Sequence, residues 1–328
     1  MSRHIRQLSV SDIGLGCMGF SHAYGPAMEH REAVRLLRHA FDLGYSFFDT
    51  AECYTGFDAA GGESLNEELV GEALRPIREQ VILATKCGVQ HLPGRQQRLD
   101  SRPESIRRAV EGSLRRLGVD CIDLYYQHRI DPAVEPELVA ATMAELIREG
   151  KIRAWGISEV GEAYLRRAHA VCPVAAVQNR YSMMARWHEA LFPVLEELGI
   201  AFVAFSPLAN GVLSTHFETT FAAADDYRQR MPQFTPAGIA ANEPLLRHLQ
   251  QLAADKGATE AQISLAWLLH RRPYIIPIPG SRREERLREN IGSTRVQLTP
   301  QELAQLDSLL SSLQLSTYGG TPPPQAKA

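Results

Sequence analysis

The sequence lacks an excess of charge of either sign. Its 328 residues include 35 Lys and Arg residues and 38 Asp and Glu residues, which leaves a formal net charge of −3. Proteins that bind the phosphate backbone of nucleic acids usually carry a strong positive field, and this composition provides none. We therefore expect no nucleic-acid partner.

Long apolar runs are also missing. The most apolar stretches, residues 200–205 and 263–269, are much shorter than the roughly 20 residues that a membrane-spanning helix needs. The first ten residues mix Arg3, His4 and Arg6 with isolated apolar residues and lack the continuous apolar segment of a secretory signal. We expect a cytoplasmic protein that does not cross a membrane.

Paired cysteines and several common catalytic motifs are absent too. The five cysteines include no Cys-x-x-Cys pair, and an odd number without such spacing argues against a disulfide framework and a zinc site. The chain contains no His-Glu-x-x-His motif, no P-loop and no Gly-x-Ser-x-Gly nucleophile elbow. We expect no metal in the site.

The sequence does contain a regular alternation of short apolar runs and longer helical segments. Predicted helices over residues 31–43, 104–117 and 137–149 each end at a glycine, the residue type that often terminates a helix. Because one helix fills each gap and no flexible linker divides the chain, we predict a single (β/α)8 TIM barrel over residues 1–328. The eight predicted strands are residues 13–16, 47–49, 81–86, 122–127, 154–158, 175–178, 201–205 and 274–277.

Three segments depart from the repeat. Residues 3–10 alternate polar and apolar side chains, which predicts an N-terminal β-hairpin at the bottom of the barrel. The stretch 209–241 after the seventh strand is rich in aromatic residues, and we predict a long loop that acts as a substrate lid. The tail from about residue 316 is too irregular for a helix or strand, and we expect it to be mobile.

One motif is misleading. Residues 14–19 spell Gly-Leu-Gly-Cys-Met-Gly directly after a predicted strand, which matches the dinucleotide-binding pattern Gly-x-Gly-x-x-Gly. In that pattern a helix follows at once, whereas here the next helix begins only near Glu29. We therefore do not predict a Rossmann unit.

Four polar residues lie at or just past the carboxyl ends of three consecutive predicted strands: Asp49, Tyr54, Lys86 and His128. Barrel active sites are built at the carboxyl ends of the strands. A buried Lys86 needs a counter-ion such as Asp49, and a nearby ammonium would lower the pKa of the Tyr54 phenol towards neutrality. Tyr54 would then serve as a proton donor, while His128 would hold a carbonyl oxygen.

These residues resemble the aldo-keto reductase superfamily, and the resemblance extends from about Leu8 to Leu310. It is carried by Asp49-Thr-Ala-Glu-x-Tyr54, Gly71-Glu-Ala-Leu74, Ala84-Thr-Lys86 and Tyr126-Gln-His128. The resemblance implies reduction of a small carbonyl substrate, an aldehyde or ketone, by NADPH. Tyr54 would be the general acid, His128 would orient the carbonyl, and Lys86 and Asp49 would tune Tyr54.

The same resemblance implies a nicotinamide cofactor that lies across the barrel mouth. Ser158 and Gln178 match positions that bind the carboxamide, whereas Glu159, which cannot donate a hydrogen bond, should turn away. Phe205 matches an aromatic residue under the nicotinamide ring. The other expected contacts on this side are Gly16, Cys17, Met18, Asp49, Ser206, Pro207, Leu208, Asn210 and Gly211.

The arginine-rich segment after the eighth predicted strand points to an anion. A glycine turn and a helix start with converging arginines suit a phosphate, although the same arginines could simply coat an exposed helix. The resemblance favours binding of the adenosine 2′-phosphate and adenine, and hence NADPH over NADH. The residues concerned are Gly280, Ser281, Arg282, Arg286, Glu289 and Asn290.

Several points stay open at the level of sequence. Phe20, Tyr24 and Trp187 are candidate substrate contacts, and the oligomeric state is undetermined. The same residues could oxidise an alcohol or sugar, and the family resemblance also includes cofactor-binding, redox-sensing partner proteins. A lyase that forms a Schiff base on Lys86 is a weaker alternative because an ion-paired lysine stays protonated.

Overall fold

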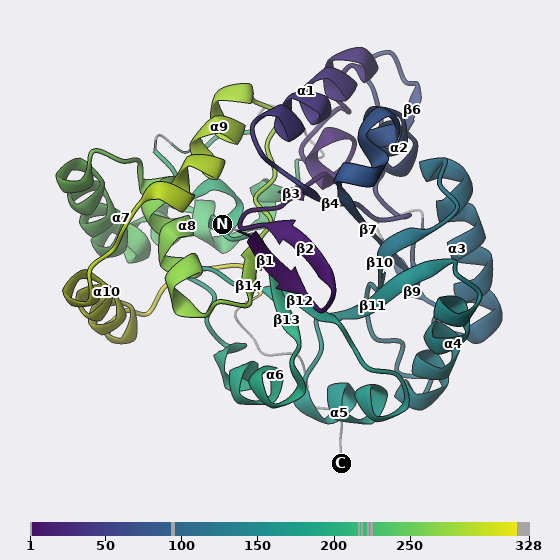
Figure 1. Ribbon diagram of the computed structural model, residues 1–328. Coiled ribbons are helices and arrows are strands. Elements are labelled where there is room, and N and C mark those ends of the chain that lie inside the picture. The colour runs from purple at the N-terminus through teal and green to yellow at the C-terminus, as the bar shows by residue number, and fades with distance from the viewer. Residues whose placement is uncertain are drawn as a thin grey trace.

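The computed structural model describes residues 2–92, 96–215, 217, 219–221, 223 and 226–319. Its centre is a ring of strands surrounded by helices (Figure 1). Neighbouring strands in this sheet are all parallel. In spatial order the strands are β3 (Leu15–Gly16), β4 (Phe47–Asp49), β7 (Ile82–Cys87), β10 (Ile122–Gln127), β11 (Ile152–Ser158), β12 (Ala176–Arg180), β13 (Ala201–Phe205) and β14 (Ile275–Pro277).

The first and last strands meet, so the sheet closes into a barrel. The amide of Gly14 donates to the carbonyl of Pro277 at 2.9 Å, and the amide of Gly16 donates to the carbonyl of Pro279 at 3.4 Å. A Cβ built on Gly280 would lie 2.6 Å from the Gly16 carbonyl oxygen. Glycine at this point therefore allows the two chain segments to approach each other. The predicted (β/α)8 barrel is confirmed.

Helices cover the outside of the barrel (Figure 1). α3 (Pro103–Leu117) starts with a proline, which is favourable in the first turn of a helix. Gly118, with a φ of 65°, follows its last residue, and glycine readily adopts this left-handed conformation at a helix end. The prediction of one helix between successive strands is wrong between β13 and β14, where the chain forms two helices, α7 (Pro236–Lys256) and α8 (Glu260–Arg271). The helices are α1 (His30–Asp42), α2 (Asn66–Leu74), α3 (Pro103–Leu117), α4 (Pro136–Arg148), α5 (Glu162–Val171), α6 (Phe192–Leu198), α7 (Pro236–Lys256), α8 (Glu260–Arg271), α9 (Glu284–Gly292) and α10 (Pro300–Ser312).

The predicted N-terminal hairpin is confirmed. β1 (Ser2–Ile5) pairs antiparallel with β2 (Leu8–Ser11) and lies across the centre of the barrel in Figure 1. The amide of Ser11 donates to the Ser46 hydroxyl just before β4, and Arg3 donates to the Arg272 carbonyl just before β14. The hairpin therefore covers the amino ends of the barrel strands.

Two further hairpins lie at the opposite end. β5 (Thr55–Phe57) pairs with β6 (Glu63–Leu65), and β8 (Val89–His91) pairs with β9 (Gln97–Leu99). Each follows a barrel strand at its carboxyl end. They form part of the wall around the polar cluster, and the sequence patterns did not predict them.

The core has an inner and an outer layer because side chains alternate along each strand. On β10, Leu124 and Tyr126 belong to the cluster inside the barrel, whereas Tyr125 belongs to the cluster between strands and helices. The hairpin residues Ile5 and Leu8 close the inner cluster from below. This packing gives the strand ends rigid positions.

The loop after β13 and the C-terminal segment contact each other. The ring of Tyr227 packs edge-on against Tyr318 at 5.3 Å, and the Ser316 amide donates to the Asn242 side chain. The predicted loop 209–241 is too long at its end, because α7 begins at Pro236 with a Thr235 cap. Residues 216, 218, 222, 224 and 225 of the predicted lid and residues 320–328 of the predicted mobile tail lie outside the described residues.

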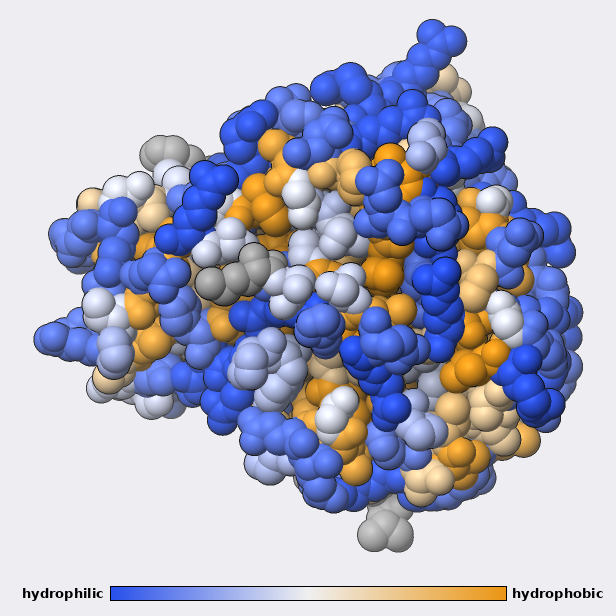
Figure 2. Space-filling model, viewed as in Figure 1, coloured by the Kyte–Doolittle hydropathy of each residue, from blue (hydrophilic) through white to orange (hydrophobic). Residues whose placement is uncertain are grey.

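The outer surface is mainly polar. On the hairpin face, hydrophilic side chains cover most of the outer helices and apolar ones show between them (Figure 2). Among the described residues, no helix is both long enough and apolar enough to cross a bilayer.

Candidate active site

Three neighbouring strands bring the predicted polar cluster together. Asp49 is the last residue of β4, Lys86 lies near the end of β7, and His128 directly follows β10. β7 pairs with both β4 and β10, and Lys86 is in register with Tyr126. The structure therefore places these side chains at the carboxyl end of the barrel, as the sequence predicted.

Lys86 and Asp49 form a fully buried ion pair. The ammonium Nζ of Lys86 lies 2.5 Å from Asp49 Oδ1 and also donates to the Thr50 carbonyl at 2.7 Å. Burial disfavours both charges and raises the pKa of Asp49. For Lys86, the attraction of Asp49 and Tyr54 outweighs burial, so the pKa of Lys86 lies above its usual value. Lys86 is therefore a stable ammonium.

Tyr54 lies next to this ammonium. Lys86 Nζ donates to the Tyr54 hydroxyl at 3.3 Å and lies 4.8 Å from the centre of its ring. The predicted lowering of the Tyr54 pKa is not found, because burial raises the pKa more than Lys86 lowers it. Tyr54 is thus a protonated phenol at neutral pH, which is the form that a proton donor requires.

His128 is a neutral imidazole beside the phenol. The rings of Tyr54 and His128 are 5.7 Å apart and nearly perpendicular. Burial, together with the neighbouring Arg129 and Lys86 charges, holds the pKa of His128 well below its usual value. The Cys53 sulfur lies 3.4 Å from His128 Nδ1, and burial raises the pKa of this thiol to about 12. When the Cys53 thiol is the donor in this contact, His128 carries its proton on Nε2, the other ring nitrogen.

The predicted carboxamide contacts are tied to the cluster. Gln178 on β12 donates from Nε2 to Asp49 Oδ2 at 2.8 Å, so it shares the carboxylate with Lys86. The Ser158 hydroxyl accepts a hydrogen bond from Arg129 at 3.0 Å. Glu159 turns away as expected, since its Oε1 accepts from the backbone amide of Arg180 at 2.9 Å.

The loop that follows β13 has an unusual backbone. Ser206, Ala209 and Asn210 have positive φ values of 51°, 49° and 60°, a conformation that side-chain-bearing residues seldom adopt and that often occurs at functional sites. The Phe205 ring lies under the guanidinium of Arg180 at 5.0 Å. Pro207, Leu208 and Gly211 belong to the same turn, which the 3-10 helix Ala209–Gly211 ends.

The segment after β14 contains the predicted phosphate-binding residues. Arg282 donates from Nε to the Gly19 carbonyl and from Nη1 to the Pro26 carbonyl. Arg286 donates to Glu289 Oε2 at 2.7 Å and to the Thr215 carbonyl at 2.9 Å. Ser281 accepts from the Arg283 amide just before α9. These arginines contact exposed or half-buried acids and backbone carbonyls, all partners that a phosphate can replace.

Asn290 on α9 stands out within this segment. The residue is buried, and its Oδ1 has no hydrogen-bond partner among the described residues. A buried carbonyl oxygen without a donor costs free energy. An adenine amino group is one donor that this oxygen would accept, which fits the expected role of Asn290.

At the first strand, Gly16, Cys17 and Met18 differ in exposure. Cys17 is completely buried, and burial raises the pKa of its thiol. Only its backbone can therefore line an open site. The Cys17 carbonyl accepts from the Asn66 side chain, and the Cys17 amide donates to the backbone carbonyl of Asp49.

The three candidate substrate residues have different surroundings. The structure corrects one of them, because the Phe20 ring is packed in the outer hydrophobic core and does not line an open pocket. The Tyr24 hydroxyl accepts from Asn210 at 3.1 Å. Trp187 is half-buried, and a Cβ built on Gly319 would lie 3.7 Å from it.

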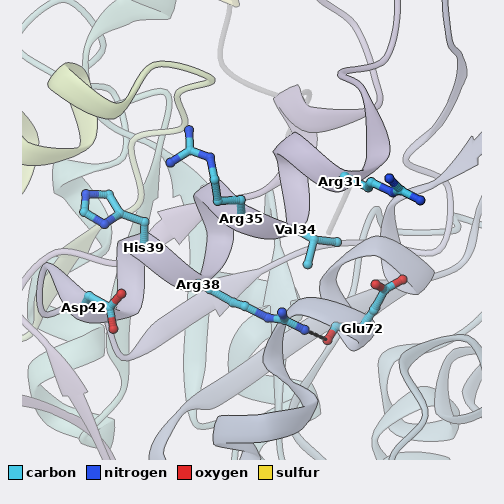
Figure 3. A pocket seen from close by; sticks show the side chains of 7 residues that line it. All are labelled: Arg31, Val34, Arg35, Arg38, His39, Asp42 and Glu72. Atoms are coloured by element: carbon cyan, nitrogen blue, oxygen red, sulfur yellow. Dashed lines mark hydrogen bonds between the residues drawn. The ribbon is translucent and has the colours of Figure 1, made fainter.

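A separate cavity of about 450 Å³ lies on the outer surface between α1 and α2 (Figure 3). Arg38 spans it and donates to the Glu72 carbonyl. This cavity is outside the barrel and contains none of the residues of the polar cluster. Its lining is Arg31, Val34, Arg35, Arg38, His39, Asp42 and Glu72. In the described ranges, no group of three or more His, Cys, Asp and Glu side chains is placed to hold a metal ion.

Comparison with known proteins agrees with this geometry. The model of the aldo/keto reductase family matches residues 12–311. The chain belongs to the aldo/keto reductase family. The resemblance seen in the motifs around Asp49, Lys86 and His128 is therefore confirmed.

Solved structures of other family members share the fold of this reductase. The glycerol dehydrogenase AKR11B4 from Gluconobacter oxydans is 26% identical, with a TM-score of 0.83 over 100% of this chain and 98% of that chain. An aldo-keto reductase from Klebsiella pneumoniae in complex with NADPH is 28% identical, with a TM-score of 0.71 over 100% and 98%. A Klebsiella pneumoniae reductase in complex with NADP and acetate is 29% identical, with a TM-score of 0.69 over 98% and 95%.

Sequence reasoning missed three features of the reductase site. The contacts of Cys53 with His128 and of Gln178 with Asp49 join residues that are far apart in the chain, so no local pattern marks them. Arg180 could have been found, because it lies two residues after Gln178 and alternation puts both on one face of the strand.

Proposed function

We propose that this reductase converts aldehydes or ketones to alcohols with NADPH, and that Tyr54 donates the proton. The observation that carries the proposal is the chain of contacts from Asp49 through Lys86 to Tyr54, at 2.5 and 3.3 Å, beside the His128 ring. This arrangement combines a protonated phenol, a permanent cation and a neutral imidazole at the mouth of a barrel.

The chemistry assigns one task to each residue. The Tyr54 hydroxyl gives its proton to the carbonyl oxygen of the substrate, and the Lys86 ammonium stabilises the negative charge that Tyr54 acquires. Asp49 keeps Lys86 charged and in place. His128 donates from Nε2 to the same carbonyl oxygen and orients it towards Tyr54. Tyr54 then regains a proton from solvent.

The residues present fit an NADPH cofactor. Ser158, Gln178 and Phe205 would hold the nicotinamide end, and Arg282 and Arg286 would hold the 2′-phosphate. The unpartnered Oδ1 of Asn290 fits a donor on adenine. A bound NADPH would supply the hydride that the carbonyl carbon accepts. The NADPH and NADP complexes of the Klebsiella pneumoniae relatives support the choice of cofactor.

Alcohol oxidation is the second candidate, since the same residues work in reverse. The similarity to a glycerol dehydrogenase supports this direction. In that case Lys86 would stabilise a Tyr54 phenolate that accepts the proton of the alcohol. Comparing initial rates of NADPH oxidation with aldehydes and of NADP+ reduction with alcohols separates the two candidates.

The test of the proposal compares wild type with Tyr54→Phe on a panel of aromatic, aliphatic and dicarbonyl aldehydes. We expect kcat to fall by about 10²- to 10⁴-fold, while NADPH binding, measured by fluorescence, stays within about twofold. Tyr164→Phe is the matched control, because Tyr164 is a half-buried phenol that donates to Gln127 outside the cluster. It should retain full activity.

Two results would contradict the proposal. If wild type binds NADPH but reduces no substrate of the panel and oxidises no alcohol, the chain is a cofactor-binding partner protein. If Tyr54→Phe keeps its activity, another group provides the proton.

A further inference from the structure

Arg180 is a buried cation at the mouth of the barrel. It is the last residue of β12, and its exposure is only 9%. Gln178, two residues earlier on the same face, contacts Asp49 of the polar cluster. In the register of the sheet, Arg180 is opposite Phe205 at the end of β13. Arg180 therefore lies nearer to the carboxyl end of the barrel than Gln178, which contacts Asp49.

This guanidinium has no carboxylate partner among the described residues. Its polar contact is Asn210 Oδ1 at 3.3 Å, and the rings of Phe205 and Tyr318 lie 5.0 and 5.4 Å away. Burial lowers the pKa of Arg180, opposed only in part by Tyr227 and Glu159. The Glu159 carboxylate accepts from the backbone of Arg180.

Two other poorly exposed arginines in the described part of the chain differ in this respect. Arg78 lies 2.8 Å from Asp123, and Arg271 lies 2.5 Å from Asp307. A buried charge is costly unless an opposite charge or strong hydrogen bonds compensate it. At Arg180 one amide oxygen and two ring faces take the place of a carboxylate, so the site is ready for an anion.

The neighbours of Arg180 indicate which bound molecule, substrate or cofactor, would carry this anionic group. Asn210, which accepts from Arg180, also donates to the Tyr24 hydroxyl. A Cβ built on Gly319 would lie 3.4 Å from Arg180 and 3.7 Å from Trp187. Arg180 thus lies where the expected cofactor contacts Phe205 and Asn210 border the candidate substrate residues Tyr24 and Trp187. The arginines expected to hold the cofactor phosphate follow β14.

We propose that Arg180 binds a carboxylate of the substrate, so that this reductase prefers carbonyl compounds that carry a carboxylate. This inference rests on the proposed function, because it assigns the substrate class of the same site. The planar guanidinium presents paired N–H donors that match the two carboxylate oxygens. The ring of Tyr318, which lies 5.4 Å from the guanidinium, would pack against the body of the substrate.

A second cation on the same rim fits this class of substrate. Arg129 follows His128 and donates to the His128 carbonyl and to the Ser158 hydroxyl. It likewise has no carboxylate partner in the described ranges of the chain. The positive charges of Arg129 and Arg180 would both attract an anionic substrate to the mouth.

The experiment uses two aldehydes with the same ring, 4-carboxybenzaldehyde, which carries a carboxylate, and methyl 4-formylbenzoate, its neutral methyl ester. We expect Arg180→Gln to lower kcat/KM for the acid about 10- to 100-fold, mainly through KM. The ester should stay within about threefold. Arg180→Lys should restore part of the loss, because it keeps the charge without the paired donors. Arg186→Gln is the control, since Arg186 is ion-paired with Glu189.

A rise in the KM for NADPH with both substrates would overturn the proposal, because Arg180 would then serve the cofactor. An unchanged ratio of acid to ester would overturn it as well. Thermal unfolding checks that each variant folds, and Arg180→Lys provides the second test if the glutamine variant does not.

A binding measurement separates this inference from the proposed function. Benzoate is titrated calorimetrically into the NADP+-loaded protein, which requires no turnover. Weaker benzoate binding in Arg180→Gln but not in Arg186→Gln supports the anion site even if wild type reduces neither aldehyde. Equal binding in all three proteins contradicts it.

Discussion

The Asp49–Lys86 pair inside the barrel and the arginines around α9 lie at the same end of the molecule, but their charges are satisfied differently. Lys86 is 0% exposed and Asp49 is 2% exposed, and each has fixed partners. Arg283 and Arg288 are 62% exposed at their side chains and pair with nearby Glu285 and Glu284. The Asp49–Lys86 pair is a fixed part of the folded barrel, whereas the exposed ion pairs around α9 can exchange their partners.

This difference determines what each region can do. An ion pair in water contributes only about 0 to 1 kcal/mol, so Arg283 and Arg288 can leave their partners at little cost. The Arg286 and Glu289 side chains are only 24% and 11% exposed, so a phosphate that binds Arg286 has to replace the Glu289 carboxylate with charge-assisted hydrogen bonds of its own. A buried pair has no water to replace a lost partner. The polar cluster is therefore ready before any ligand arrives, whereas the α9 region is completed by what it binds.

The largest effect should come from Lys86→Met, which leaves Asp49 buried without its cation. Breaking a buried pair costs about 3 to 5 kcal/mol, so we expect a large drop in the free energy of unfolding and no measurable reductase activity. Urea unfolding and NADPH oxidation measure the two quantities. The double variant Asp49→Asn/Lys86→Met should recover part of the stability and none of the activity. Unchanged stability in Lys86→Met would show that the pair is not a structural element.

Glu52 is a half-buried carboxyl group with no cation at hydrogen-bond distance in the described part of the chain. It accepts from the Gly88 amide at 2.9 Å, and burial raises its pKa from 4.5 to about 7. The native state then holds more protons than the unfolded state between these values, so stability falls as pH rises from about 4.5 through 7. Glu52→Gln should remove this loss. The free energy of unfolding of the variant, relative to wild type, should therefore be about 2 kcal/mol higher at pH 8 than at pH 5.

Urea unfolding of wild type and Glu52→Gln at pH 5 and pH 8 checks the prediction. Glu285→Gln is the control, because Glu285 is an exposed carboxylate paired with Arg283 and should show no such pH dependence. The same pH slope in wild type and Glu52→Gln would contradict a raised pKa at Glu52.

The smallest effect in this series should come from the arginines around α9. We expect Arg286→Ala to raise the KM for NADPH by about tenfold and to leave the KM for NADH and the thermal midpoint nearly unchanged. Arg283→Ala should change neither KM, because Arg283 is not among the expected phosphate contacts. Equal losses with NADPH and NADH would mean that Arg286 does not hold the 2′-phosphate.

Much of the barrel could be predicted because its strands are buried runs with clear ends. The strands over 47–49, 122–127 and 201–205 have the predicted boundaries, since apolar residues stop where the polar cluster begins. The hairpins after β4 and β7 were missed because their short strands carry polar residues such as Glu63 and Gln97 without alternation. The second helix before β14 was missed although the sequence carries the signals for two helices, a helix-ending Gly257 and a capping box of Thr259 and Gln262.

The candidate site was predictable in its residue types but not in its electrostatics. Asp49, Lys86 and His128 follow strands, so their meeting follows from the fold. The pKa of Tyr54 depends on how deeply the phenol is buried, and no sequence pattern reports that depth. Gln178 and Arg180 act through partners on distant strands, which only the closed barrel brings near.

The hairpin at the bottom of the barrel and the segment around Gly319 at its mouth differ as points at which the protein can be attached to a surface. Ser2 lies in the hairpin on the closed face, whereas Gly319 lies beside Arg180 and Trp187. Attachment of this protein to a bead or an electrode through the hairpin would leave the mouth facing the bulk solution. A linkage at Gly319 would stand beside the entrance, so the point of attachment decides how freely reactants diffuse in.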